Sequence, residues 1–175
     1  MFINSNFFQI DEEEYKQITQ LLSPIEIKPN LPNDWIYGLA DSDYGPEAKK
    51  IVDEIDELAK GNFPFLTEMV SSNFSGYTYG MSCGRHKDTP ENTMILMVYL
   101  VPYWTLEMEG FTYIFTDKNK NMAKAVIPSS GRCIVFSSEL EHMAGGVSRQ
   151  CELMKITFTA RYIYDKEKYV QATKR

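Results

Sequence analysis

The sequence predicts a mainly β fold of the α+β class, in which helices pack on one face of a jelly roll or β-sandwich. Two helix-like segments occupy about 11–22 and 46–60, near the start of the chain. After them, short stretches rich in aromatic and β-branched residues alternate with turn-forming residues. Helices followed by many short strands are typical of this class. Because no repeat or linker interrupts the chain, we expect one domain over 1–175, with a helical buttress at about 1–63 and a jelly-roll core at about 64–163.

The first helix has a start signal at Asp11. Its carboxylate can accept hydrogen bonds from backbone N–H groups, and Glu14 stands three positions on, where its side chain can bond back to the cap. Pro24 ends the run. The apolar residues at helical spacing are Tyr15, Ile18, Leu21 and Leu22.

The second helix carries an apolar stripe, and Gly61 predicts its end. A stripe of this kind needs an apolar partner, which the outer face of the larger sheet supplies. We therefore expect both helices to pack there. The side chains expected to be buried are Ile18, Leu21, Ile51, Ile55 and Leu58.

The remaining chain divides into loops and strands. The segment 24–46 is rich in Pro, Asn and Asp and is predicted to be a loop. The overlapping segment 30–47 is a candidate cover for a site. Turns are expected at 117–121 and 129–131. The expected strands are 65–71, 73–81, 93–101, 111–116, 122–127, 132–137 and 152–163.

Composition and charge argue against several classes of protein. The net charge of −6 would repel a phosphate backbone, so nucleic acid is not expected as a partner. The longest apolar run, 94–102, is far shorter than the ~20 residues that cross a bilayer, so no membrane association is expected. Residues 1–10 do not resemble a secretory signal. Three cysteines without zinc spacing, Cys83, Cys133 and Cys151, indicate reduced thiols and a cytoplasmic location.

The chain contains only two histidines, and both stand near strand ends. His86 is followed two residues later by Asp88, so in an extended segment the two side chains point to the same side. His142 comes just after the strand expected at 132–137. Two imidazoles and one carboxylate form the facial ligand set of non-haem iron(II), which leaves coordination positions open. The three residues are therefore predicted to be metal ligands and catalytic.

The order of these landmarks is similar to that of a known family. The segment from about 74 to 162 resembles the double-stranded β-helix core of the prolyl-hydroxylase-like 2-oxoglutarate/iron(II)-dependent oxygenases. The helical N-terminal part is also similar to the helices that buttress the larger sheet in that family. The matching landmarks are Tyr77, Gly80, His86, Asp88, 97–100, Trp104, Gly110, 128–136, His142 and 155–158.

The resemblance implies an activity and its cofactors. It implies an iron(II)- and 2-oxoglutarate-dependent dioxygenase that uses O2 to hydroxylate a C–H bond and releases succinate and CO2, with ascorbate as an optional reductant. The substrate is expected to be a small molecule or a peptide, with a peptidyl proline or a free amino acid as the two readings. The sequence does not indicate the oligomeric state.

The resemblance also implies a cation for the distal carboxylate of 2-oxoglutarate, on the strand after the second histidine. Lys155, Arg149 and Arg161 compete for this role. Strand alternation favours Lys155, because Thr157 then adds a hydroxyl on the same face while Ile156 points away with its apolar neighbours. Arg161 lies roughly 20 Å further along a strand and is expected at the surface, and Arg149 is expected in a loop. Tyr77 or Tyr79 could add a phenol hydrogen bond, whereas Tyr99 is expected in the core.

Two alternatives remain open from the sequence. One is a cupin-type metalloenzyme that does not use an oxo-acid, in which Lys155 would be dispensable. The other is a non-catalytic jelly-roll binding module, in which nothing would bring His86, Asp88 and His142 together.

Overall fold

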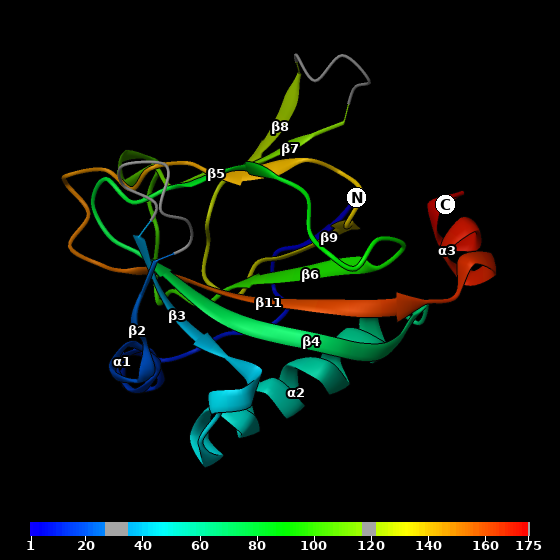
Figure 1. Ribbon diagram of the computed structural model, residues 1–175, viewed down its shortest axis with the longest axis horizontal. Coiled ribbons are helices and arrows are strands. Elements are labelled where there is room, and N and C mark those ends of the chain that lie inside the picture. The colour runs from blue at the N-terminus through cyan, green and yellow to red at the C-terminus, as the bar shows by residue number, and fades with distance from the viewer. Residues whose placement is uncertain (27–34, 117–121, 175) are drawn as a thin grey trace.

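Two antiparallel sheets face each other, with helices on the outer side of the larger one (Figure 1). The computed structural model describes residues 1–26, 35–116 and 122–174. Within these residues the larger sheet has seven strands and the smaller sheet has four. The mainly β jelly roll expected from the sequence is therefore confirmed.

The larger sheet forms the base of the molecule, with β11 at its centre. β11 pairs along its length with β4 and, on its other edge, with β6. In spatial order its strands are β1 (Phe2–Asn4), β9 (Cys133–Ser137), β6 (Met94–Tyr99), β11 (Lys155–Tyr164), β4 (Leu66–Tyr77), β3 (Trp35–Ala40) and β2 (Ser23–Glu26).

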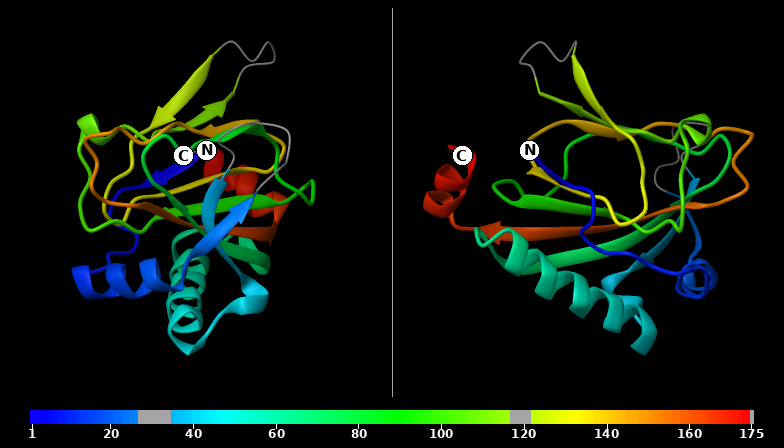
Figure 2. Two further views of the ribbon diagram at one scale, coloured as in Figure 1. Left: turned by 60° about the vertical axis from the view of Figure 1, so that its left-hand side comes forward. Right: turned by 180° about the vertical axis from the view of Figure 1, so that it is seen from behind.

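The smaller sheet lies opposite the larger one in both views of Figure 2. Its strands, in spatial order, are β5 (Cys83–His86), β10 (His142–Ala144), β7 (Thr112–Phe115) and β8 (Ala123–Val126). The turn expected at 117–121, between β7 and β8, lies outside the described residues. The turn expected at 129–131 is present, because Arg132 donates its backbone N–H to the Ser129 carbonyl at 3.0 Å.

Helices α1 (Glu12–Leu21) and α2 (Pro46–Asn62) pack beneath the larger sheet, as predicted (Figure 1). The Asp11 carboxylate caps α1 by accepting from the backbone of Glu13 and Glu14 at 2.9 and 2.8 Å. Gly61 does not end α2, which continues to Asn62. A third helix, α3 (Lys166–Thr173), follows β11 and was not predicted. None of the helices in the described chain is long and apolar enough to cross a membrane.

The apolar faces of the two main helices differ from the prediction by one residue each. Ile18, Ile51 and Ile55 are buried, as expected. Leu21 and Leu58 are 37% and 38% exposed, so their predicted burial is wrong. Their places on the sheet are taken by Leu22 and Ala59, each four residues after a buried isoleucine rather than three.

The segment predicted to be one loop, 24–46, also contributes to the sheet. It contains most of β2 and all of β3, which pair with each other and join the edge of β4. A one-turn helix, Asp41–Asp43, follows β3, and a second lies at Leu106–Met108. Part of the proposed site cover, 30–34, lies outside the described residues. The N-terminal part of the chain thus supplies three strands as well as the helical buttress.

Other strand boundaries also differ from the prediction. The two strands expected at 65–71 and 73–81 form the single strand β4, and β1, β5 and β10 were not predicted. The alternation of β11 is as predicted: Ile156 and Phe158 are fully buried in the core beneath the sheet, together with residues of α1 and α2. The opposite face of β11 therefore looks into the space between the two sheets.

Gly131 is required by a close backbone approach. Its φ is +66°, and a Cβ atom at this position would lie 2.5 Å from the Phe8 carbonyl oxygen. The Gly131 carbonyl also accepts the backbone N–H of Phe7 at 2.8 Å, which fixes the N-terminal segment against this turn.

Gly131→Ala is expected to lower the free energy of unfolding by about 2–4 kcal/mol, because the left-handed backbone and the clash add together. Gly61→Ala is the matched control, since nothing lies within 4 Å of its added Cβ. That change should leave the stability equal or raise it by about 0.5–1 kcal/mol. Denaturant unfolding of both variants measures the difference, and equal stabilities would contradict the close approach.

Candidate metal centre

The two histidines face each other across neighbouring strands of the smaller sheet. His86 is the last residue of β5, His142 is the first residue of β10, and the two form an antiparallel pair. Their ring centroids lie 4.3 Å apart. Asp88 lies two residues beyond the end of β5, so the chain leaving the strand brings its carboxylate back to the same point.

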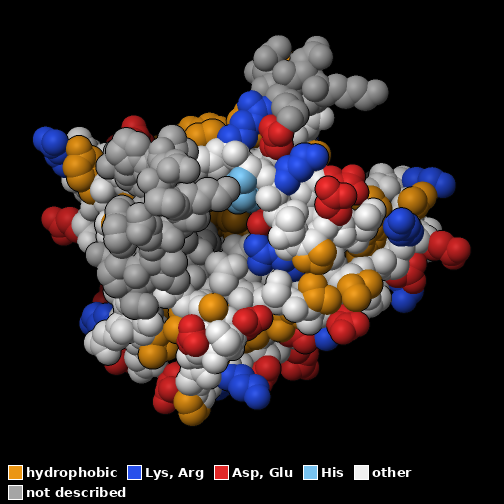
Figure 3. All heavy atoms as spheres, in the orientation of Figure 1, with side chains coloured by type: hydrophobic (Ala, Val, Ile, Leu, Met, Phe, Trp, Pro, Cys, Tyr) orange, Lys and Arg blue, Asp and Glu red, His pale blue; other side chains and the backbone are white. Residues whose placement is uncertain are grey.

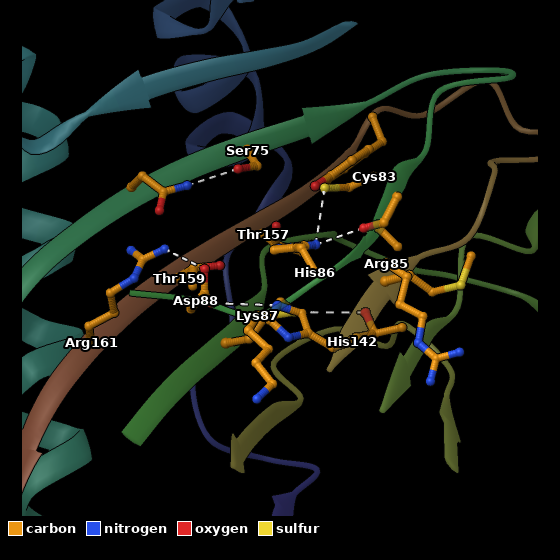
Figure 4. Close-up of a pocket in the computed structure, with 17 residues that line it drawn as sticks. Ser75, Cys83, Arg85, His86, Lys87, Asp88, His142, Thr157, Thr159 and Arg161 are labelled. Carbon is orange, nitrogen blue, oxygen red and sulfur yellow. Dashed lines mark hydrogen bonds and ion pairs between the residues drawn. The ribbon is translucent and has the colours of Figure 1, made fainter. Parts of the chain in front are cut away.

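The three predicted ligands converge on one point (Figure 4). One ligand atom from each of His86, Asp88 and His142 lies within 4.8 Å of the others. The distance between His142 Nε2 and Asp88 Oδ2 is 3.5 Å. Asp88 and His142 are 9% and 3% exposed, whereas His86 is only half-buried. Two imidazoles and a carboxylate at this spacing suit an iron(II) ion with open positions.

Backbone carbonyls orient both imidazole rings. His86 Nδ1 lies 2.7 Å from the Gly84 carbonyl oxygen, and His142 Nδ1 lies 3.2 Å from that of Leu140. A carbonyl only accepts, so each Nδ1 carries the proton and donates it. Each Nε2 then keeps its lone pair for a metal, which is the usual arrangement of a ligating histidine.

The pKa values of the two histidines shift in opposite directions. Burial lowers the pKa of His142, which favours the neutral ring that a metal requires. Contact with the Cys83 sulfur, 3.7 Å from Nδ1, raises the pKa of His86 to about 9. A metal ion at neutral pH therefore competes with a proton at His86.

The triad opens into a cavity of about 400 Å³ between the two sheets. Figure 3 shows histidine atoms in a hollow of this face, with Lys and Arg side chains beside it. The smaller sheet and the segment after β5 contribute one wall of the cavity, and β4 and β11 contribute the other. The lining residues used below are Asn73, Ser75, Tyr77, Lys87, Asp88, Thr157, Thr159 and Arg161.

Arg161 lies in this cavity, so its expected surface position is wrong. Its Nη2 donates to Asp88 Oδ1 at 2.7 Å, which leaves Asp88 Oδ2 toward His142. The side chain is only 19% exposed. The inner face of β11 lines the cavity, so a residue six positions beyond Lys155 on the same face meets the metal ligand Asp88.

Lys155 is fully buried on the inner face of β11, as the alternation predicts. Its Nζ donates to the Gly110 carbonyl at 2.9 Å and lies 4.4 Å from the centre of the Tyr77 ring. Burial lowers its pKa to about 7. Tyr77 and Thr157 line the cavity itself, and Lys155 lies next to Tyr77 across the β4–β11 pair.

The competing residues Arg149 and Tyr79 lie away from the cavity lining. Arg149 Nη2 donates to the Tyr79 hydroxyl at 3.1 Å, and Tyr79 is 55% exposed. Arg149 follows β10 in a loop, as predicted.

Tyr99 is a polar group that the sequence reading assigned only to the core. It pairs with Thr157 across β6 and β11 and points between the sheets. Its hydroxyl is buried and has no well-formed hydrogen bond among the described residues, with Thr112 as its polar neighbour. Burial raises the pKa of Tyr99, so the phenol keeps its proton and its O–H can donate a hydrogen bond to a ligand. The alternation of β6, which places Tyr99 on the face of the cavity residue Met97, was the available signal.

Comparison with solved structures identifies the fold. A prolyl-4-hydroxylase from Pseudomonas putida superposes with a TM-score of 0.67 and 18% identity, covering 92% of this chain and 91% of that one. A prolyl hydroxylase from Trichoplax adhaerens, solved with a peptide fragment of hypoxia inducible factor, gives 0.67 and 20% over 98% and 86%. A collagen prolyl hydroxylase from Paramecium bursaria Chlorella virus-1, solved with 2-oxoglutarate, gives 0.60 and 16% over 91% and 93%.

The fold is therefore the double-stranded β-helix found in 2-oxoglutarate/iron(II) oxygenases, as the sequence resemblance implied. No protein-family model matches the sequence, and a search of the curated proteins finds no match.

Proposed function

We propose that this protein is an iron(II)- and 2-oxoglutarate-dependent dioxygenase that hydroxylates a C–H bond of its substrate. The observation that carries the proposal is the convergence of His86, Asp88 and His142 at the mouth of a cavity inside a double-stranded β-helix. When bound together, iron, 2-oxoglutarate and O2 supply the oxidising power for hydroxylation and yield succinate and CO2.

The chain's own residues have separable tasks in this proposal. The triad holds the metal by three positions and leaves the others open, while the two carbonyl contacts keep both Nε2 atoms aimed at it. Burial of Asp88 and His142 limits the access of water to these two ligands. Arg161 holds Asp88 by one oxygen, which favours a single oxygen for the metal.

We place the distal carboxylate of 2-oxoglutarate near Lys155. Three facts support this choice: the ammonium is buried, it has one carbonyl acceptor among the described residues, and it adjoins the cavity residues Tyr77 and Thr157. An ammonium has three donors, so an arriving carboxylate would complete its hydrogen bonds. Tyr99, beside Thr157, adds a phenol donor on the same side.

The buried lysine also bears on the alternatives. A cupin-type metalloenzyme without an oxo-acid would have no use for a buried ammonium, which is costly to desolvate. A non-catalytic binding module would not require three ligand atoms within 4.8 Å. We place the enzyme in the cytoplasm, a location supported by its unpaired cysteines Cys83, Cys133 and Cys151.

Turnover of the cosubstrate tests the proposal. The purified protein, loaded anaerobically with iron(II) and then given O2 and 2-oxoglutarate, is expected to form succinate slowly alone and at least about tenfold faster with a substrate. Succinate is measured against a panel of amino acids, other small acids and proline-containing peptides. The Asp88→Ala variant is the control for metal-independent decay of 2-oxoglutarate. Equal succinate from the wild type and this variant would contradict the proposal.

A further inference from the structure

The part of the cavity beyond the metal ligands has a polar floor. On β4 and β11 the inward side chains form what we term the polar row: Asn73, Ser75, Thr157, Thr159 and Arg161. Within it, Asn73 donates to the Ser75 hydroxyl at 2.9 Å. Figure 4 shows Thr157, Thr159 and Arg161 along one strand, with Arg161 next to Asp88. A polar floor of this kind suits a polar ligand better than a purely apolar one.

Arg161 is the last residue of the polar row, and not all of its N–H donors have an acceptor among the described residues. A guanidinium has five N–H donors, and one nitrogen, Nη2, is bound to Asp88. Its Nε is buried and has no hydrogen-bond partner among the described residues. A buried N–H without a partner is costly, so this edge of the guanidinium suits a ligand acceptor.

The charges around the cavity also favour an anion. Asp88 is the one acidic side chain among the described lining residues, whereas Arg85, Lys87 and Arg161 are basic. Arg85 is engaged with Glu141 at 2.6 Å, so it is committed elsewhere. A divalent metal on Asp88 would take up much of the carboxylate charge that now balances Arg161. With a metal bound, the positive charge of Arg161 would therefore be only partly balanced by Asp88.

This anion cannot be the same one that Lys155 binds. Lys155 and Arg161 lie six residues apart on one strand, or roughly 20 Å between Cα atoms. The distal carboxylate that Lys155 would hold is therefore a different group from an anion at Arg161. The metal would bind the other carboxylate of 2-oxoglutarate, which leaves the unpartnered Nε of Arg161 for a carboxylate of the substrate.

We propose that Arg161, at the end of the polar row, binds a carboxylate of the substrate, so that the substrate is a small carboxylic acid such as a free amino acid. The inference rests on the proposed function and specifies its substrate class. A guanidinium binds a carboxylate through two parallel N–H donors, which fixes orientation as well as affinity. Clamping the acid beside Asp88 would hold the neighbouring C–H bonds close to the metal. An internal residue of a peptide has no carboxylate for this clamp.

The test compares carboxylic acids with their own amides. Free amino acids, N-acyl amino acids and short-chain acids are titrated, each beside its primary amide, into the protein loaded with iron(II) and 2-oxoglutarate without O2. Binding is measured by calorimetry, so no turnover is needed. We expect at least one acid to bind about ten- to a hundredfold more tightly than its amide.

The variants separate the clamp from general electrostatics. Arg161→Gln is expected to reduce the acid-to-amide preference to within about threefold. Because this change also frees Asp88, the variant is compared at saturating metal, and the ratio cancels any loss shared by acid and amide. Lys87→Gln removes the same charge from an exposed position on the cavity wall, and should retain most of the preference.

Each outcome of these titrations leads to one conclusion. Equal affinities for every acid and its amide in normally loaded protein would overturn the inference alone, as would tight binding of a capped proline peptide that is unchanged in Arg161→Gln. If Lys87→Gln lost as much of the acid-to-amide preference as Arg161→Gln does, the preference would come from the overall positive charge of the cavity. That result would also overturn the inference. Failure of iron(II) or 2-oxoglutarate to bind would contradict the proposed function instead.

Discussion

Replacing His142 or His86 with alanine is expected to weaken iron(II) binding by more than about a hundredfold, the largest effect predicted for this protein. Loss of contacts behind a ligand already costs about ten- to a hundredfold, and loss of a ligand itself should exceed that. Each variant removes one of three donors whose ligand atoms lie within 4.8 Å of one another. Iron retained after anaerobic dialysis, measured by a chelating dye, gives the affinity.

Asp88→Asn sharpens this experiment, because it keeps the shape of the side chain and removes only the charge. It should also lose iron, although it can still accept a hydrogen bond from Arg161. Tyr79→Phe, a change on the exposed side of the molecule, is the control and should bind iron as the wild type does. Thermal unfolding of each variant checks that the fold is intact. A folded His142→Ala protein that retains one iron per chain would falsify the ligand assignment.

The fold class could be predicted because alternation and turn residues are local signals. The two wrong burial predictions in the helices, Leu21 and Leu58, show what such local signals do not determine. Leu21 and Leu22 are adjacent leucines, and both fit the helical spacing from Ile18. The side that faces the sheet is decided by how the helix docks, and docking buries Leu22. A small residue gave no signal at all: Ala59 is buried where the larger Leu58 was expected.

The strand content of 24–46 was missed for a different reason. Its frequent Pro, Asn and Asp residues predict turns, but β3 is held by pairing with β4, to which it is not adjacent in sequence. Strand pairing of this kind is a tertiary effect that a local pattern does not contain. β10 illustrates the same point, because its three residues form a strand only between β5 and β7.

The candidate site could be predicted in part from residue type and spacing. The scarcity of histidine made the pair His86 and His142 conspicuous, and the spacing to Asp88 fixed the third member. The role of Arg161 was hidden, because separation along β11 says nothing about which loop crosses the far end of the strand. Contact with Asp88 depends on how the chain after β5 turns back over the sheet.

Lys155→Met is expected to weaken 2-oxoglutarate binding by about ten- to a hundredfold, which corresponds to the ~1.5–3 kcal/mol of a charge-assisted hydrogen bond. Methionine fills similar space without the ammonium, so the buried position next to Gly110 stays packed. Arg149→Gln is the matched control, since its guanidinium contacts Tyr79 outside the cavity lining. Titration of 2-oxoglutarate into the iron-loaded wild type and the two variants gives the three affinities. A large loss in Arg149→Gln with none in Lys155→Met would transfer the role to the loop residue.

The pH dependence of 2-oxoglutarate binding provides an independent test of Lys155, with a definite sign. Burial lowers the pKa of the free side chain to about 7, so above pH 7 it is mostly neutral. A carboxylate bound beside it favours the ammonium and raises this pKa, so binding above pH 7 takes up a proton. The affinity should therefore fall by up to about tenfold per pH unit as the pH rises above 7, and change little through Lys155 below pH 6. Calorimetry in buffers of different ionisation enthalpy counts the protons, and uptake at pH 8 that is unchanged in Lys155→Met would show that another group titrates.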